Sequence, residues 1–132
     1  MAIKSVKISL IKIRRKNICH LFHLQQIIKL TLRQENEIAK RTGELITILP
    51  GKKEENLMLH LEDNQIMYFR GDDIPCMMIA VKLYNTIDFD AKKKFTEELV
   101  KMIKETTNIE INDVYVSFDE YPNWGKQGTL FQ

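Results

Sequence analysis

Helical and strand periodicities alternate along residues 31–61. Thr31 and Gln34 fit a capping box, in which the threonine caps the helix and the glutamine reaches back to its amide. Residues at helical spacing follow until Pro50-Gly51 stops the pattern. These positions are Ile38, Thr42, Leu45, Ile46 and Leu49. Residues 57–61 then alternate leucine with Met58 and His60, which predicts a strand with one apolar side.

The second half of the chain repeats this order. The pattern predicts a strand over 77–83, a helix over 90–105 and a strand over 114–118. The helical stripe consists of Phe95, Leu99, Met102 and Ile103. One shift of 57 residues superposes both the helix stripe and the second strand of the two halves, which indicates an internal repeat.

Two strand-helix-strand copies predict an α+β fold of order β-α-β-β-α-β. They form a four-stranded mixed sheet with both helices on one face. The first copy needs an opening strand, and we expect it within 21–30, the only segment available. The other sheet face is then bare, and so short a chain cannot cover it, so we expect oligomerisation through that face.

The charge distribution divides the chain in two. The 132 residues suit one domain, and 44% hydrophobic with 29% charged residues is typical of a globular protein. Residues 1–22 contain six cations and no acid, whereas the other 110 residues hold 14 Lys and Arg against 18 Asp and Glu. We therefore predict a basic extension over 1–22, for which a mistranslated leader is one explanation, and a domain over 23–132.

The composition excludes several classes of protein. Cys19 and Cys76 cannot form a disulfide scaffold, no apolar run approaches the roughly 20 residues of a membrane span, and no signal-peptide core is present. A cytoplasmic protein without membrane contact is expected.

Two further patterns, a group of cysteine and histidine residues and a run of lysines, do not support a binding site. Cys19, His20, His23 and His60 match no zinc-site spacing, so no metal is predicted. The run Lys92–94 opens an amphipathic helix and is followed by glutamates, so we expect a solvated face and no nucleic-acid partner.

Several motifs together resemble the macrophage migration inhibitory factor family of the tautomerase superfamily, in particular a bacterial phenylpyruvate tautomerase-like member. They are residues 59–71 (LHLEDNQIMYFRG) with Pro75-Cys76, residues 113–118 (DVYVSF) with Asn123-Trp124-Gly125, and the turn Leu49-Pro50-Gly51-Lys52. The resemblance implies a homotrimer that catalyses keto–enol tautomerisation of small aromatic α-keto acids between subunits, without a cofactor.

The resemblance also implies site residues. A lysine at the place of Lys52 would hold the substrate carboxylate, and Tyr84 would contribute a backbone amide. Tyr115 would close the pocket from a neighbouring subunit, next to Ser117, which stands where some members have asparagine. The family's base is an N-terminal proline, whose place falls at or next to His20 inside this chain, and a peptide nitrogen has no basic lone pair.

A reading-frame hypothesis accounts for the missing proline. If residues 18–22 are encoded ATA-TGC-CAT-TTA-TTC, reading from the third base gives ATG-CCA-TTT-ATT, or Met-Pro-Phe-Ile. Arg14-Arg15 can likewise be AGG-AGG, a ribosome-binding sequence. Arg codons other than AGG, or an Ile18 codon other than ATA, would exclude the hypothesis.

The sequence thus predicts a keto–enol tautomerase of phenylpyruvate-like α-keto acids that is impaired as written because the proline is absent. The alternative is a non-catalytic trimeric ligand- or protein-binding member of the same fold.

Overall fold

A computed structural model describes the backbone of residues 6–19, 22–27 and 29–132, and side chains from residue 29 onward. The helices are α1 (Leu32–Leu45) and α2 (Phe89–Thr107). The strands are β1 (Val6–Cys19), β2 (Phe22–Ile27), β3 (Leu57–Gln65), β4 (Met77–Tyr84), β5 (Val114–Tyr121), β6 (Trp124–Lys126) and β7 (Thr129–Phe131). Short 3-10 turns follow α1 (Ile46–Ile48) and precede β3 (Glu54–Asn56) and β5 (Ile111–Asp113).

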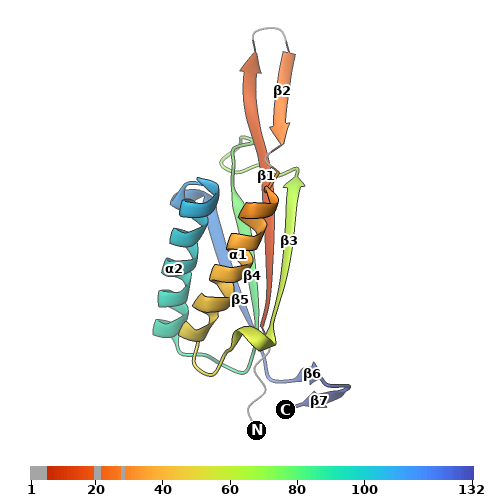
Figure 1. The fold of residues 1–132 in the computed structure, drawn as a ribbon, viewed down its shortest axis with the longest axis vertical. Coiled ribbons are helices and arrows are strands. Elements are labelled where there is room, and N and C mark those ends of the chain that lie inside the picture. The colour runs from red at the N-terminus through yellow and green to blue at the C-terminus, as the bar shows by residue number, and fades with distance from the viewer. Residues whose placement is uncertain (1–5, 20–21, 28) are drawn as a thin grey trace.

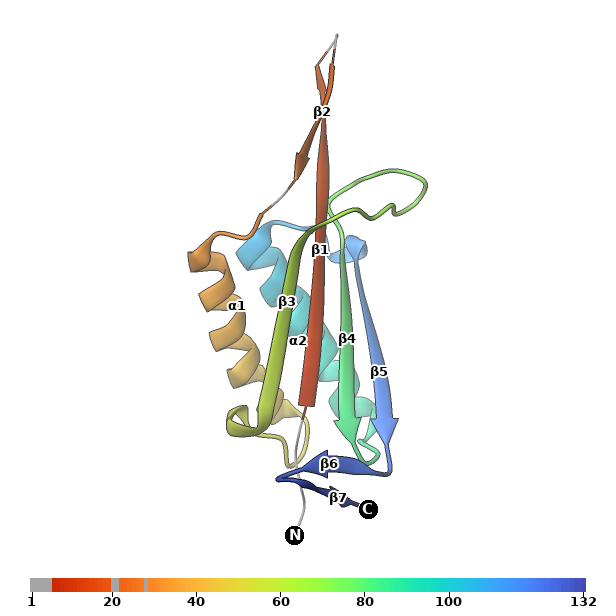
Figure 2. The same ribbon diagram turned by 90° about the vertical axis from the view of Figure 1, so that its right-hand side faces the viewer.

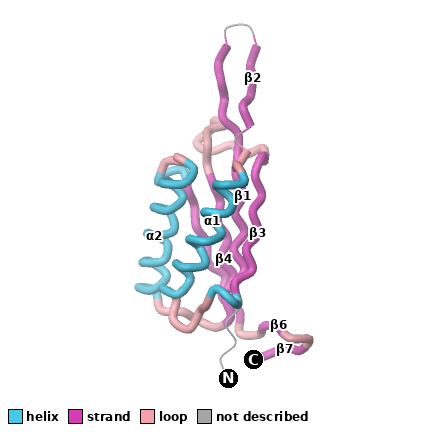
Figure 3. Tube along the Cα trace, in the orientation of Figure 1, coloured by secondary structure: helices cyan, strands magenta, loops and turns pink. Residues whose placement is uncertain are grey.

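The core of the sheet is four strands in the order β3, β1, β4, β5. β1 runs parallel to β3 and antiparallel to β4, and β5 runs parallel to β4. Both helices lie on one face of this sheet, so the body has two layers (Figures 1 and 3). The predicted α+β fold with a mixed four-stranded core sheet is confirmed.

The opening strand is not where the pattern predicted it. The central position beside β3 and β4 is held by residues 6–13 of β1, and not by residues 21–30. β1 then continues beyond the body, where β2 pairs antiparallel with residues 14–19 (Figure 2). The expectation failed because residues 6–10 alternate apolar and polar positions as regularly as residues 22–25 do. The division of the chain at residue 22 stays a prediction.

The predicted capping box opens α1. The Thr31 hydroxyl accepts from the Gln34 amide at 3.1 Å, and the Gln34 side chain accepts from the Thr31 amide at 2.9 Å. The predicted stripe faces the sheet, since Ile38, Thr42, Ile46 and Leu49 are fully buried and Leu45 is half-buried. Local sequence therefore sets both the start and the rotation of this helix.

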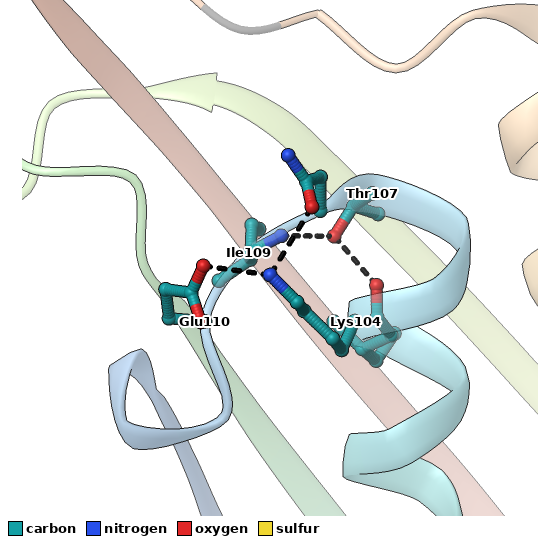
Figure 4. Close-up of polar contacts among 6 residues, drawn as sticks. Lys104, Thr107, Ile109 and Glu110 are labelled. Atoms are coloured by element: carbon teal, nitrogen blue, oxygen red, sulfur yellow. Dashed lines mark hydrogen bonds and ion pairs between the residues drawn. The ribbon is translucent and has the colours of Figure 1, made fainter.

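α2 ends in a compact polar cap. Asn108 adopts a left-handed conformation with φ 63°, and the Lys104 ammonium donates to the Asn108 and Glu110 side chains at 3.1 and 2.6 Å (Figure 4). The Thr107 hydroxyl donates to the Ile103 carbonyl at 2.7 Å and accepts from the Ile109 amide at 3.2 Å. These contacts turn the chain sharply from α2 toward β5.

The internal repeat extends to the turns. β3 and β5 begin 57 residues apart, and each is preceded at the same distance by a 3-10 turn. The four residues of the predicted α2 stripe are all fully buried, and they pack with the β4 residues Ile79, Val81 and Leu83. Among the described residues, no helix is long and apolar enough to cross a bilayer.

Candidate functional site

Lys52 and Tyr84 meet at one end of the sheet. Lys52 follows the turn that begins at Leu49, whose carbonyl accepts from the Lys52 amide at 3.0 Å, and Gly51 supplies the positive φ of 77° that this turn needs. The Lys52 side chain runs inward and is 5% exposed. Its Nζ donates to the backbone carbonyl of Tyr84, the last residue of β4, at 3.0 Å. Tertiary structure thus joins two predicted site residues that lie 32 positions apart.

A buried ammonium has defined chemistry. Withdrawing a cation from water is unfavourable unless hydrogen bonds or an anion compensate it, and the Tyr84 carbonyl is one such acceptor. An ammonium in this position can also donate strong charge-assisted hydrogen bonds to an anionic group such as a carboxylate.

The start of β1 adjoins this position. Val6 pairs with Leu83, the residue before Tyr84, and on its other side with Leu57. The start of β1 therefore lies next to the end of β4. His20, to which the family's proline position was assigned, and residues 1–5 lie outside the described residues.

The C-terminal hairpin covers the same end of the molecule. β6 pairs with β7, and the hairpin lies at the end of the sheet opposite the projecting β1–β2 hairpin (Figure 2). The Lys126 ammonium donates to the Asn56 side chain at 2.8 Å, which ties the hairpin to the turn before β3. Sequence reasoning did not identify this contact, because no local pattern connects residues 70 positions apart.

Tyr115 and Ser117 lie elsewhere in the protomer. Tyr115 is opposite Met78, whereas Tyr84 is opposite Tyr121, so six residues, or about 20 Å of strand, separate the two ends. Both residues are on the sheet face without helices, where Tyr115 is 61% exposed and packs edge-on against Phe69 at 5.0 Å between ring centroids. The structure does not bring them to Lys52 within one chain, so their role would require a second subunit.

A further polar cluster on the bare face escaped the sequence analysis. Lys82 Nζ donates to the Tyr121 hydroxyl at 3.1 Å and lies 3.7 Å from Asp119. The hydrogen bond with Tyr121 raises the pKa of Lys82. Lys82 and Asp119 are directly opposite each other in the β4–β5 register. A parallel alignment of these two strands would therefore have predicted the cluster from the sequence, because it pairs opposite charges.

Other candidate groups have structural surroundings. Cys76 is 3% exposed, and burial, with a smaller effect from Asp113, raises the pKa of its thiol, which opposes nucleophilic chemistry. In the basic run, Lys92 lies 2.6 Å from Glu120 and over the Phe118 ring. The absence of a metal and of a nucleic-acid partner both stay predictions.

Comparisons with known proteins identify the family of this chain. The family described as "Macrophage migration inhibitory factor (MIF)" matches residues 21–132. A macrophage migration inhibitory factor homolog of Brugia malayi is 24% identical over 79 residues, covering 60% of this chain and 69% of that protein.

Solved structures extend the similarity to the fold. MIF2 of Leishmania major superposes with a TM-score of 0.79 at 17% identity, covering 96% of this chain and 97% of that one. The structure described as Pt0534 inactivated by 2-oxo-3-pentynoate superposes with a TM-score of 0.70 at 18% identity, covering 94% and 93% of the two chains.

Proposed function

Because the chain belongs to the macrophage migration inhibitory factor family, we propose that it is a keto–enol tautomerase of phenylpyruvate-like α-keto acids. The proposal applies to a form that begins with proline at the family's position. The chain as written is expected to be impaired, because its residue at that position is joined to others on both sides.

The observation that carries this proposal is the buried Lys52 ammonium beside the end of β4 and the start of β1. An α-keto acid has a carboxylate for Lys52 and an adjacent carbon-bound proton for a base. 2-Oxo-3-pentynoate, the compound that inactivates Pt0534, is itself an α-keto acid, and this supports α-keto acids as the substrate class.

A secondary amine at the start of the central strand would complete the chemistry. Desolvation and a nearby cation such as Lys52 both lower the pKa of an amine, so a terminal proline there would be neutral and able to remove a carbon-bound proton. An amide nitrogen within a chain cannot do this. The proposed division of roles is therefore binding by Lys52 and proton transfer by the proline.

The proposal includes a homotrimer. Met58 and Tyr115 are 65% and 61% exposed on the sheet face that no helix covers, and burial of these side chains against other copies would stabilise an assembly. In such an assembly Tyr115 and Ser117 would approach the Lys52 site of a neighbouring subunit.

A bacterial source is likewise a prediction, because the matched relatives named above come from Brugia malayi and Leishmania major.

The second candidate is a non-catalytic trimeric protein that binds a ligand or another protein. The absence of a proline at or next to His20 favours it. Such a protein would retain the Lys52–Tyr84 site and bind α-keto acids without turning them over.

An enolisation assay with phenylpyruvate separates the two candidates. We expect little activity from the chain as written and clear activity from a chain restarted as Met-Pro-Phe-Ile followed by His23, after removal of the methionine. Activity in neither form, with phenylpyruvate binding retained, would refute the enzyme and support the binding protein.

The role of Lys52 is tested in the proline-starting form. Lys52→Met removes a charge-assisted hydrogen bond worth about 1.5–3 kcal/mol, so kcat/KM should fall roughly 10- to 100-fold. Lys53→Met is the matched control, because Lys53 is exposed and its ion pair with Glu55 is long at 3.9 Å. The activity of the Lys53→Met variant should be unchanged. Equal losses in both variants would contradict the carboxylate-binding role.

A further inference from the structure

The central strand position is filled by a segment outside the family match. Residues 6–13 of β1 lie between β3 and β4, yet the sequence similarity to the family begins only at residue 21. The fold requires a strand at this position, because β3 and β4 do not pair with each other. The question is which segment of the chain can supply it.

β2 has the same alternation as the strand that now fills the position. Val6, Ile8 and Leu10 are opposite Leu83, Val81 and Ile79, which are all fully buried. In β2, Phe22 and Leu24 are apolar, whereas His23 and Gln25 are polar. A displacement by 16 residues places Phe22 and Leu24 at the positions of Val6 and Ile8 with the apolar side retained, whereas an odd displacement would reverse the faces.

The connection to α1 fits either arrangement. Ile27 is opposite Arg14, which directly follows Ile13, the last β1 residue paired with β3, so β2 ends at the top of the core sheet. The Leu30 amide donates to Asp63 of β3 at 2.8 Å and anchors the chain there before α1 begins. Exchange moves Ile27 by three residues, or about 10 Å, from beside Arg14 to the position of Ile11. Because β2 now runs antiparallel to β1, exchange also reverses its direction, and Phe22 passes from beside Cys19 to the position of Val6.

Unfavourable pairings in the present arrangement favour exchange. Lys7 is directly opposite Lys82, and like charges at such positions repel. Lys12 is opposite Met77, which is only 2% exposed. Within the part of the chain that the structure describes, β2 pairs only with residues 14–19, in a two-stranded ribbon beyond the body, and such isolated ribbons are marginally stable (Figure 2).

We propose that β2 is a second occupant of the central strand position and exchanges with residues 6–13 of β1. Exchange places His23, in the position of Lys7, opposite Lys82. It also sets the polar residue Gln26 at the position of Leu10, and this placement disfavours the exchange. It releases the basic N-terminal segment from the sheet, and it brings the residue before Phe22 to the end of β4 beside Lys52. The exchange does not depend on catalysis, so it stands or falls separately from the proposed function.

Paired cysteines report the two arrangements in the full chain. With Cys19→Ser and Cys76→Ala as background, Ser9→Cys with Ala80→Cys reports the present arrangement, because Ser9 and Ala80 are directly opposite. Gln25→Cys with Ala80→Cys reports the exchanged one. The disulfides are identified by mass spectrometry after mild oxidation.

Proline variants then force the choice. A proline in a central strand removes a ladder hydrogen bond, and Leu10 and Ile79 are opposite each other on the same rung. We expect Leu10→Pro to keep its helical circular dichroism and cooperative unfolding and to form the 25–80 disulfide, since β2 can replace β1. Ile79→Pro, whose strand has no substitute, should unfold.

A further variant makes the result specific. Leu24→Pro alone should leave the fold intact, whereas Leu10→Pro with Leu24→Pro should unfold because both occupants are disabled. The proposal is overturned if Leu10→Pro alone unfolds as Ile79→Pro does, or if it remains folded without the 25–80 disulfide.

Discussion

Glu120 connects three separate parts of the chain, and its charge should contribute measurably to stability. From β5, its carboxylate accepts from Lys92 Nζ of α2 at 2.6 Å and from the Ile87 amide before α2 at 2.5 Å. The Glu120 and Lys92 side chains are only 24% and 18% exposed. The hydrogen bond from Lys92 is the largest of the effects that lower the pKa of Glu120.

The magnitude for Glu120→Gln follows from these contacts. The amide oxygen of glutamine can still accept from Ile87, so the main loss is one charge-assisted hydrogen bond of about 1.5–3 kcal/mol, reduced by partial solvent screening. We expect the free energy of unfolding to fall by about 1–2 kcal/mol at pH 7. With a urea m-value of about 2 kcal/mol/M, the midpoint should fall by about 0.5–1 M.

The pH dependence gives a second, independent readout. Because the folded pKa of Glu120 is lowered, its contribution is complete above the ordinary glutamate pKa of about 4.3 and is lost as the pH falls through the folded value. The difference between wild type and Glu120→Gln should therefore be constant above about pH 5 and shrink below pH 4.

The assay is urea unfolding followed by circular dichroism at one fixed protein concentration, because assembly would make stability depend on concentration. Glu110→Gln is the matched control: Glu110 contacts Lys104 at the same 2.6 Å, but its side chain is 68% exposed, so a loss below about 0.5 kcal/mol is expected. Equal losses in the two variants, or a Glu120→Gln difference that is unchanged at pH 3, would refute the reasoning.

Three further predictions concern packing, capping and reactivity. Phe95→Ala should lower the free energy of unfolding by about 3–5 kcal/mol, because Phe95 is fully buried against Phe118, whereas Phe89→Ala, at a 72% exposed position, should have little effect in urea titrations. Thr31→Ala should lower it by about 1 kcal/mol and Thr31→Ser should not, a contrast that thermal melts can resolve. Alkylation of Cys76 at pH 8 should be slow until denaturant is added, and rapid labelling of native protein in a peptide-resolved mass spectrum would contradict its burial.

The local elements could be predicted because their determinants are local. The Thr31 capping box and the apolar stripes of the two helices depend on residues within one or two turns, and the structure has them as predicted. The repeat of 57 residues predicted that the two halves form equivalent units that pack in equivalent ways. The fold class was therefore accessible from sequence alone.

Strand partnership was decided only by the tertiary structure. Residues 6–10 and 22–25 carry the same alternation, so periodicity does not distinguish which of them lies between β3 and β4. The same holds for contacts such as Lys52 with Tyr84, or Glu120 with Lys92, which exist because distant segments end at the same place in the sheet. Side-chain periodicity is set by neighbours in the chain, whereas strand pairing and ion pairing depend on the whole arrangement of the sheet and its helices.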